Sequence, residues 1–229
     1  MLVFIPKWNL TKNKESEELG NTGTLSEVWK NRFFISVIPM GLFNYGGLMA
    51  IQTLWAGPWM TRVAGYTPLQ SATGLFWINV TMLVSFFLWG YFLPKISGIG
   101  FSAKRILKLG LPISFSVMSV IILLGPKAGA FYITLFILSS ISLSVTQPAV
   151  GLSFSGYSAG KALTSFNLLI FAGTFIMQWL MGLVIDIVKG MGHTEIFAFK
   201  SAFSVFLILS IISYIFFLIL NRKKYENKT

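Results

Sequence analysis

The stretch LTSFNLLIFAGTFIMQWLMGLVIDIVK, residues 163–189, decides the fold class of the whole chain. No charged residue lies between Lys161 and Asp186, so the segment is long enough to cross a bilayer core of about 30 Å at about 1.5 Å rise per residue. At about 100° per residue, Thr174 and Gln178 lie about 20° on either side of Asn167 on the helix. A polar stripe cannot face lipid cheaply, so the segment predicts a bundle of helices with polar groups at its centre.

The composition of the whole chain agrees with a membrane protein. The chain has 229 residues, of which 55% are hydrophobic and 11% are charged, whereas a soluble domain has roughly 25% charged residues. It has no Cys and one His, which excludes disulfides, thiolate nucleophiles, Cys-based metal sites and His-cluster metal sites. We therefore expect no enzymatic activity, no cofactor and no metal.

The net charge of +11 does not predict a nucleic-acid partner. The Lys and Arg residues form short clusters between apolar runs, where they set the orientation of a protein in the membrane. We interpret these clusters as orientation signals and expect the lipid bilayer, and no nucleic acid, as the surrounding partner.

Apolar runs separated by basic, Gly-containing or Pro-containing segments divide the chain into three parts. Residues 1–32 are predicted to be a cytoplasmic linker that ends in a short interfacial helix. Residues 33–220 are predicted to be an all-α integral membrane bundle, and residues 221–229 a basic cytoplasmic tail. The bundle is expected to contain six spans at approximately 33–56, 71–93, 108–125, 129–152, 163–187 and 200–220.

The distribution of basic residues predicts how these six spans are oriented. With six spans, both termini lie on one side, and that side carries 14 of the 18 Lys and Arg residues. Cytoplasmic segments carry the excess of Lys and Arg, so both termini are predicted to be cytoplasmic and the protein to be a multi-pass protein of the cell membrane, the inner membrane in a bacterium.

Several local patterns resemble the C-terminal six-helix half of a major facilitator superfamily (MFS) transporter of bacterial type. Residues 54–59 (LWAGPW) resemble the end of the seventh helix in a bacterial subgroup of that family, and residues 160–163 through 178–179 resemble its eleventh helix. Residues 90–95 (GYFLPK) with Lys104 and Arg105 stand where the family repeats a basic loop, although the acidic residue of that loop is absent here. The resemblance covers residues 25–220, about half of a twelve-helix transporter.

The resemblance implies a fold of 3+3 inverted repeats that forms the C-terminal bundle of the MFS fold, and secondary active transport of a small polar solute by alternating access. The chain would then be a truncated or split half, and its partner would be an N-terminal six-helix half or a second copy of itself. The alternative is a stand-alone six-helix membrane subunit or scaffold without transport activity. The substrate and the coupling ion are not predicted.

In this family the first, second, fourth and fifth helices of each half line the cavity. The polar residues of the corresponding spans are therefore the candidates for binding substrate: Tyr45, Gln52, Asn79, Gln147, Asn167, Thr174 and Gln178. The competing interpretation is that they join neighbouring helices, and Gln147 could bond the backbone freed by Pro148. Asp186 is a possible ion-coupling residue, or an interfacial carboxylate near the end of the fifth span.

Overall fold

The computed structural model describes residues 25–98, 102–154 and 156–222, and these residues form helices without any β-strand. The predicted linker up to residue 24 and the tail from residue 223 lie outside the described residues. Six helical segments are long and apolar enough to cross a membrane, which suggests a multi-pass membrane protein. We call them spans 1 to 6: Arg32–Val63, Pro68–Leu93, Ala103–Lys127, Ala130–Gly151, Ser158–Gly190 and Glu195–Arg222.

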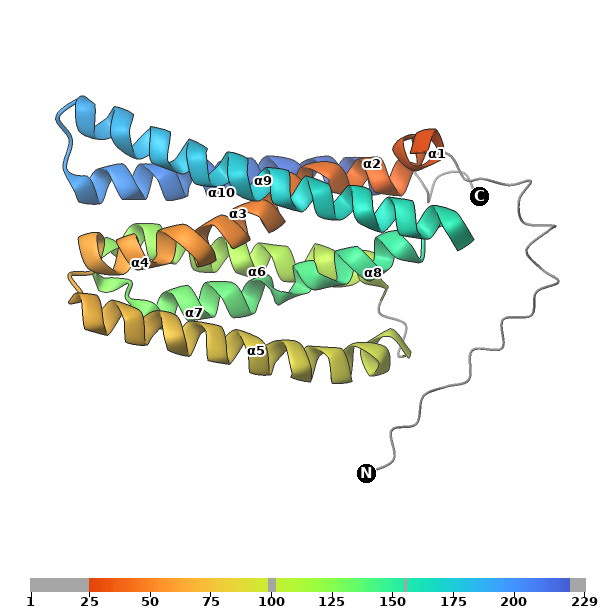
Figure 1. Cartoon of the computed structure of the whole chain (residues 1–229), viewed down its shortest axis with the longest axis horizontal. Helices are drawn as coiled ribbons and strands as arrows, with labels where there is room; N and C mark the ends of the chain where they lie inside the picture. Colours follow the sequence, from red (N-terminus) through yellow and green to blue (C-terminus); the bar gives the residue numbers. More distant parts are fainter. Residues whose placement is uncertain (1–24, 99–101, 155, 223–229) are drawn as a thin grey trace.

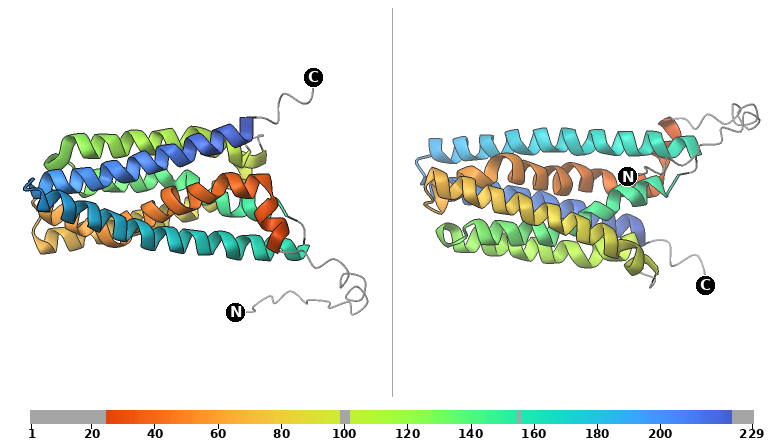
Figure 2. Two further views of the ribbon diagram at one scale, coloured as in Figure 1. Left: turned by 90° about the horizontal axis from the view of Figure 1, so that it is seen from above. Right: turned by 60° about the horizontal axis from the view of Figure 1, so that its bottom comes forward.

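The six spans run side by side, and the first and last described residues lie at the same end of the bundle (Figures 1 and 2). We call this the terminal end and the opposite end the distal end. The helices α6 (Ala103–Leu124) and α10 (Glu195–Arg222) lie on the back of the bundle in Figure 1, and α5 (Pro68–Gly98) and α9 (Gly156–Gly190) lie on its front. The short helix α1 (Leu25–Lys30) packs across the start of α9.

Span 1 is an irregular helix at the centre of the bundle. It begins at α2 (Arg32–Pro39), where the Asn31 side chain accepts hydrogen bonds from the N–H groups of Phe33 and Phe34 at 2.9 and 3.1 Å. The α-helical pieces α2, α3 (Gly46–Ala50) and α4 (Ala56–Pro58) then alternate with π-helical pieces η2 (Met40–Tyr45), η3 (Ile51–Trp55) and η4 (Trp59–Val63). Two of the π-helical pieces directly follow a proline, which lacks the N–H group that a regular helix needs.

Span 4 is also interrupted. It consists of α7 (Ala130–Ser139), a 3₁₀ segment η6 (Ser140–Val145) and α8 (Thr146–Gly151), and it follows span 3 through the short 3₁₀ turn η5 (Gly125–Lys127). The Ser140 hydroxyl lies 2.6 Å from the Ser114 hydroxyl of α6 and donates to the carbonyl of Phe136 at 2.8 Å. These bonds satisfy polar groups where the helix changes its pitch.

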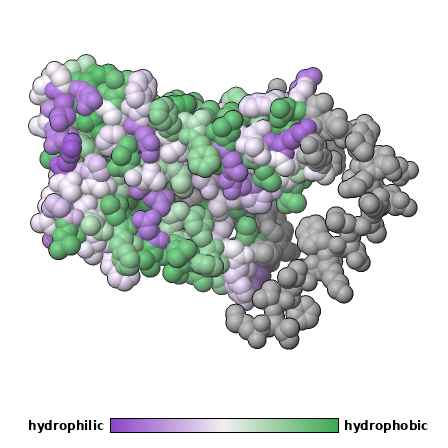
Figure 3. Space-filling model, in the orientation of Figure 1, coloured by the Kyte–Doolittle hydropathy of each residue, from purple (hydrophilic) through white to green (hydrophobic). Residues whose placement is uncertain are grey.

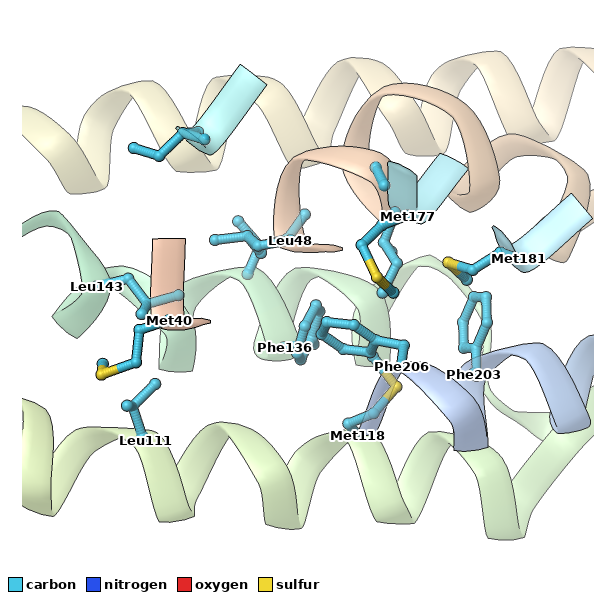
Figure 4. Close-up of a cluster of buried hydrophobic side chains, with 14 of the residues drawn as sticks. Met40, Leu48, Leu111, Met118, Phe136, Leu143, Met177, Met181, Phe203 and Phe206 are labelled. Atoms are coloured by element: carbon cyan, nitrogen blue, oxygen red, sulfur yellow. The ribbon is translucent and has the colours of Figure 1, made fainter. Parts of the chain in front are cut away.

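Aromatic and methionine side chains fill the core between spans 1, 3, 4, 5 and 6. Figure 4 shows Phe136 and Phe206 side by side, with Met118 and Met177 flanking them from opposite helices. The two Phe rings meet edge to face at 5.9 Å between centroids. Span 1 has 61% of its most apolar window buried and span 2 has 6%, so span 1 belongs to the core and span 2 lies at the edge of the bundle.

Trp59 anchors the distal half of this core. Its side chain is fully buried and stacks on Phe203 of α10 with ring centroids 4.5 Å apart. Its indole N–H donates to the carbonyl of Ala128 at 2.8 Å, in the turn between spans 3 and 4. One residue of span 1 therefore holds the last span against the third and fourth.

Two glycines bring the backbones of spans 1 and 5 into direct contact. A Cβ atom on Gly173 would overlap the carbonyl oxygen of Leu42, and a Cβ atom on Gly46 would overlap the backbone at Gly173. Because the obstructing atoms belong to the backbone, a larger residue would force the two helices apart. Small residues permit such close packing between membrane helices.

We expect Gly173→Ala to destabilise the bundle by about 1–3 kcal/mol, the usual cost of overpacking. The measurement is thermal unfolding of the purified chain in detergent. Gly160→Ala is the matched control on the same helix, since no atom lies within 4 Å of the position that its Cβ would take. Equal effects of the two substitutions would show that the contact between spans 1 and 5 is not tightly packed.

Candidate functional site

The polar residues predicted from the sequence form hydrogen bonds between neighbouring spans. The Gln52 side-chain amide of η3 donates to Oδ1 of Asn79 on α5 at 3.1 Å and lies 2.7 Å from the sulfur of Met82. The amide of Asn79 in turn donates to the carbonyl of Leu75 in its own helix at 2.8 Å. Oε1 of Gln52 is buried without a hydrogen-bond partner in the described structure. This contact joins spans 1 and 2.

A second pair of amides joins spans 4 and 5. Nε2 of Gln147 on α8 donates to Oδ1 of Asn167 on α9 at 2.7 Å. The Asn167 side chain is exposed, and its own amide group makes no hydrogen bond within the described residues. Gln147 therefore bonds a neighbouring helix, and not the backbone near Pro148, and Asn167 keeps two free donor hydrogens.

A third contact joins span 5 to span 1. Nε2 of Gln178 donates to the hydroxyl of Thr53 at 3.0 Å, and that hydroxyl donates to the carbonyl of Met49 at 2.6 Å. Thr174, which lies between Asn167 and Gln178 on the same stripe, donates to the carbonyl of Ile170 in its own helix at 2.9 Å. Thr53 was not singled out in the sequence, because a threonine can always bond its own helix.

The stripe on α9 lies along the border between the buried and the exposed sides of that helix. Met177 and Met181 are fully buried on one side, whereas Phe171 and Phe175 are 73% and 72% exposed on the other. In the space-filling view, hydrophilic patches interrupt the hydrophobic surface near the middle of the bundle as well as at its distal end (Figure 3). We call the surface that carries these amides the amide face; its members are Gln52, Thr53, Asn79, Gln147, Asn167, Thr174 and Gln178.

Tyr45 does not belong to the amide face. It lines a small cavity of about 20 Å³ between spans 1, 2 and 4, together with Met82, Ser85, Ser140 and Ser144. This volume has room for a single water molecule and is too small for an organic solute. The structure therefore separates Tyr45 from the other predicted residues.

Asp186 lies near the distal end of α9, where its side chain is exposed and makes no ion pair in the described structure. The nearby Glu195 instead pairs with Arg62 at 3.3 Å and with Lys189 at 3.4 Å, which ties the turn after span 1 to the loop between spans 5 and 6. All three side chains are more than a third exposed, so these pairs contribute little to stability.

Asn44 of span 1 has a structural role. The amide of Asn44 donates to the carbonyl of Ser210 at 3.2 Å and to the hydroxyl of Ser213, and all three residues are buried between spans 1 and 6. Within the described ranges, no group of three His, Asp or Glu side chains is arranged to hold a metal ion.

Comparison of the chain with known protein families, with characterised proteins and with solved structures finds no match in any of the three.

The hydrogen bond between Gln147 and Asn167 can be measured with a double-mutant cycle of Gln147→Leu and Asn167→Leu. We expect a coupling free energy of about 0.6 kcal/mol, and not more than about 2 kcal/mol, as for other interhelical hydrogen bonds in membrane proteins. The control cycle pairs Asn167→Leu with Gln52→Leu, which bond different partners and should show coupling below about 0.5 kcal/mol. Similar coupling in both cycles would contradict the specific pairing.

Proposed function

We propose that the chain is the C-terminal half of a secondary active transporter of the major facilitator type, which moves a small polar solute by alternating access. The observation that carries this proposal is the amide face. Its three interhelical hydrogen bonds join span 1 to span 2, span 4 to span 5 and span 5 to span 1. The resemblance to the family implies that these same four helices line the cavity.

The physical argument starts from the exposure of these groups. Asn79 and Asn167 are exposed in the middle of apolar helices, where lipid could offer them no hydrogen bonds. A second six-helix bundle placed over the amide face would enclose it and leave a polar space between the two bundles. The partner bundle would be a separate N-terminal half or a second copy of this chain, and each bundle would consist of two inverted three-helix repeats.

The mechanism follows from this arrangement. The two bundles rock about the enclosed face and expose it alternately to each side of the membrane. Asn167 and Gln178 can exchange hydrogen bonds with water for hydrogen bonds with a polar solute, because each has bonding capacity that the protein does not use. No covalent step and no cofactor are required.

Coupling to an ion gradient would rely mainly on the partner bundle. In the described part of the chain, all Asp and Glu side chains lie near the ends of the spans, at Glu27, Asp186 and Glu195. Asp186 is the one closest to a span interior and would act in coupling only if the partner bundle covers it.

The alternative function, a stand-alone membrane subunit or scaffold, is favoured by a different observation. Gln52, Gln147 and Gln178 already bond neighbouring helices of the same chain. Such bonds would hold a bundle together without any transported solute. The two functions differ in whether water reaches the amide face from both sides of the membrane.

Labelling of single cysteines tests this difference, because the natural chain has no Cys. Asn167→Cys and Gln178→Cys are each expressed in cells and treated with a water-soluble maleimide added from one side or the other. We expect both to react from both sides, at least about tenfold faster than a thiol in hydrocarbon, where the reactive thiolate is strongly disfavoured.

Ile212→Cys is the matched control, since Ile212 is 56% exposed on α10, a span that contributes no residue to the amide face. It should react slowly from either side if it faces lipid. Labelling of positions 167 and 178 from one side alone would favour the scaffold. Labelling as slow as that of position 212 from both sides would exclude a water-filled path along the amide face.

The orientation of the chain can be tested separately. Because 14 of the 18 Lys and Arg residues are assigned to the side of the termini, we expect both termini in the cytoplasm. A green fluorescent protein fused after residue 229 should fluoresce, and alkaline phosphatase fused at the same position should be inactive. An active phosphatase at this position would reverse the proposed orientation.

A further inference from the structure

The amide face contains two chains of hydrogen bonds whose directions are fixed by backbone carbonyls. A carbonyl oxygen carries no hydrogen, so the side-chain group that lies against it must be the donor. In the first chain, the 2.8 Å contact with the carbonyl of Leu75 places the side-chain nitrogen of Asn79 on that carbonyl. The oxygen of Asn79 then faces Gln52, and the 3.1 Å contact between them requires the nitrogen of Gln52. Oε1 of Gln52 is left as the free end of this chain.

The second chain has the same direction. The Thr53 hydroxyl lies 2.6 Å from the carbonyl of Met49 and must donate to it. Because a hydroxyl has a single hydrogen, Thr53 can only accept from Gln178, whose side-chain nitrogen lies 3.0 Å away. Oε1 of Gln178 is therefore the free end of the second chain, and it makes no hydrogen bond within the described residues.

The two chains meet at one level of the bundle, which we call the central level. Gln52 and Thr53 are consecutive residues of η3, with Cα atoms about 3.8 Å apart, and they bond span 2 and span 5 respectively. Asn167 lies about 16 Å from Gln178 along α9, at about 1.5 Å rise per residue. The free donors of Asn167 are therefore too distant to satisfy the oxygens at the central level.

The central level has more hydrogen-bond acceptors than donors. The free oxygens of Gln52 and Gln178 each have two lone pairs, and the bonded oxygens of Asn79 and Thr53 each retain one. The remaining donors are the second amide hydrogens of Gln178 and Asn79. Nε2 of Gln52 also contacts the sulfur of Met82 at 2.7 Å, which takes up its second hydrogen.

One of these acceptors needs a partner from outside the described structure. Oε1 of Gln52 is buried and has no hydrogen-bond partner there. Leaving a buried acceptor unpaired is unfavourable, and native structures pair nearly all of them. The contact with Asn79 prevents Gln52 from turning its amide round, so the missing partner has to be a donor on another molecule.

We propose that the central level selects solutes by their hydrogen-bond donors, so that the solute is rich in O–H or N–H groups, as a neutral polyol is. Thr53 and Asn79 are positioning residues for this selection, because each transmits the direction of a backbone carbonyl to a glutamine. This assignment rests on the proposed transport function, in which a solute reaches the central level.

The glutamine side chains can report on this selection, because the chain contains only four of them. The full chain is labelled with ¹³C and ¹⁵N in the glutamine side-chain amides and studied in detergent by NMR. The probes are mannitol and the tetra-O-methyl ether of erythritol, which has as many non-hydrogen atoms as mannitol but no O–H group. We expect mannitol to shift the carbonyl resonances of Gln52 and Gln178 and to bind at least about tenfold more tightly than the ether.

Gln70 is the internal control. Its oxygen accepts a hydrogen bond from the N–H group of Thr67, in the turn between spans 1 and 2, and its resonance should show no saturable shift. An equal response of the central glutamines to the two probes, or no saturable response to mannitol, would overturn the proposal.

Thr53→Val removes the hydroxyl that orients Gln178. The Nε2 resonance of Gln178 should move, and the preference for mannitol over the ether should fall by at least about threefold. Thr53→Ser keeps the hydroxyl and should restore both, which a role limited to packing of the methyl group would not. If Thr53→Val does not fold, Asn79→Leu applies the same test to Gln52.

An unchanged Gln178 resonance in Thr53→Val would also overturn the proposed selection. It would leave the cysteine labelling of positions 167 and 178 unaffected, so the transport function would stand without it. If the labelling instead excludes a water-filled path while Thr53 still orients Gln178, the transport function fails and the orientation of the amides remains.

Discussion

Every polar group that enters an apolar helix needs a hydrogen-bond partner, and this requirement shapes the whole bundle. The spans satisfy it in three ways. Thr174 bonds its own helix, Asn44 bonds a neighbouring helix in the core, and the amides of Gln147 and Asn167 bond each other at the surface. The first two arrangements are complete within the chain, whereas the third leaves donors available. At the surface of the described bundle, the hydrogen bonding of the amide face is therefore unfinished.

Span 1 connects this face to the core. Gly46 touches the backbone of span 5 at Gly173, and Trp59 stacks on Phe203 of span 6. Between these two contacts, the π-helical piece η3 carries Gln52 and Thr53, which bond spans 2 and 5. Because a π-helical turn shifts the direction of the residues that follow it, one helix can pack its glycines and aromatic residues inward and still present two polar side chains to its neighbours.

The sequence was sufficient to predict six long apolar helices and the shared stripe of Asn167, Thr174 and Gln178, since both depend on local composition and helical periodicity. It could not predict that Gln147 would bond Asn167, or that the Thr53 hydroxyl would accept a hydrogen bond from Gln178, because these pairs depend on how separate helices pack. Tyr45 was a candidate for the same site as Gln52, but it lies at the end of the π-helical piece η2 and lines a small cavity between spans 1, 2 and 4.

The separation of charges from amides also limits what the amide face can recognise. The described Lys, Arg, Asp and Glu residues lie near the ends of the spans, where water can solvate them, because an ion in the apolar interior would be costly. The amide face offers neutral donors and acceptors alone. A solute with a net charge would lose its hydration there without gaining an opposite charge from this bundle. If the proposed transport function is correct, the solute is either neutral, such as a polyol or an amide, or its charge is balanced by a group on the partner bundle.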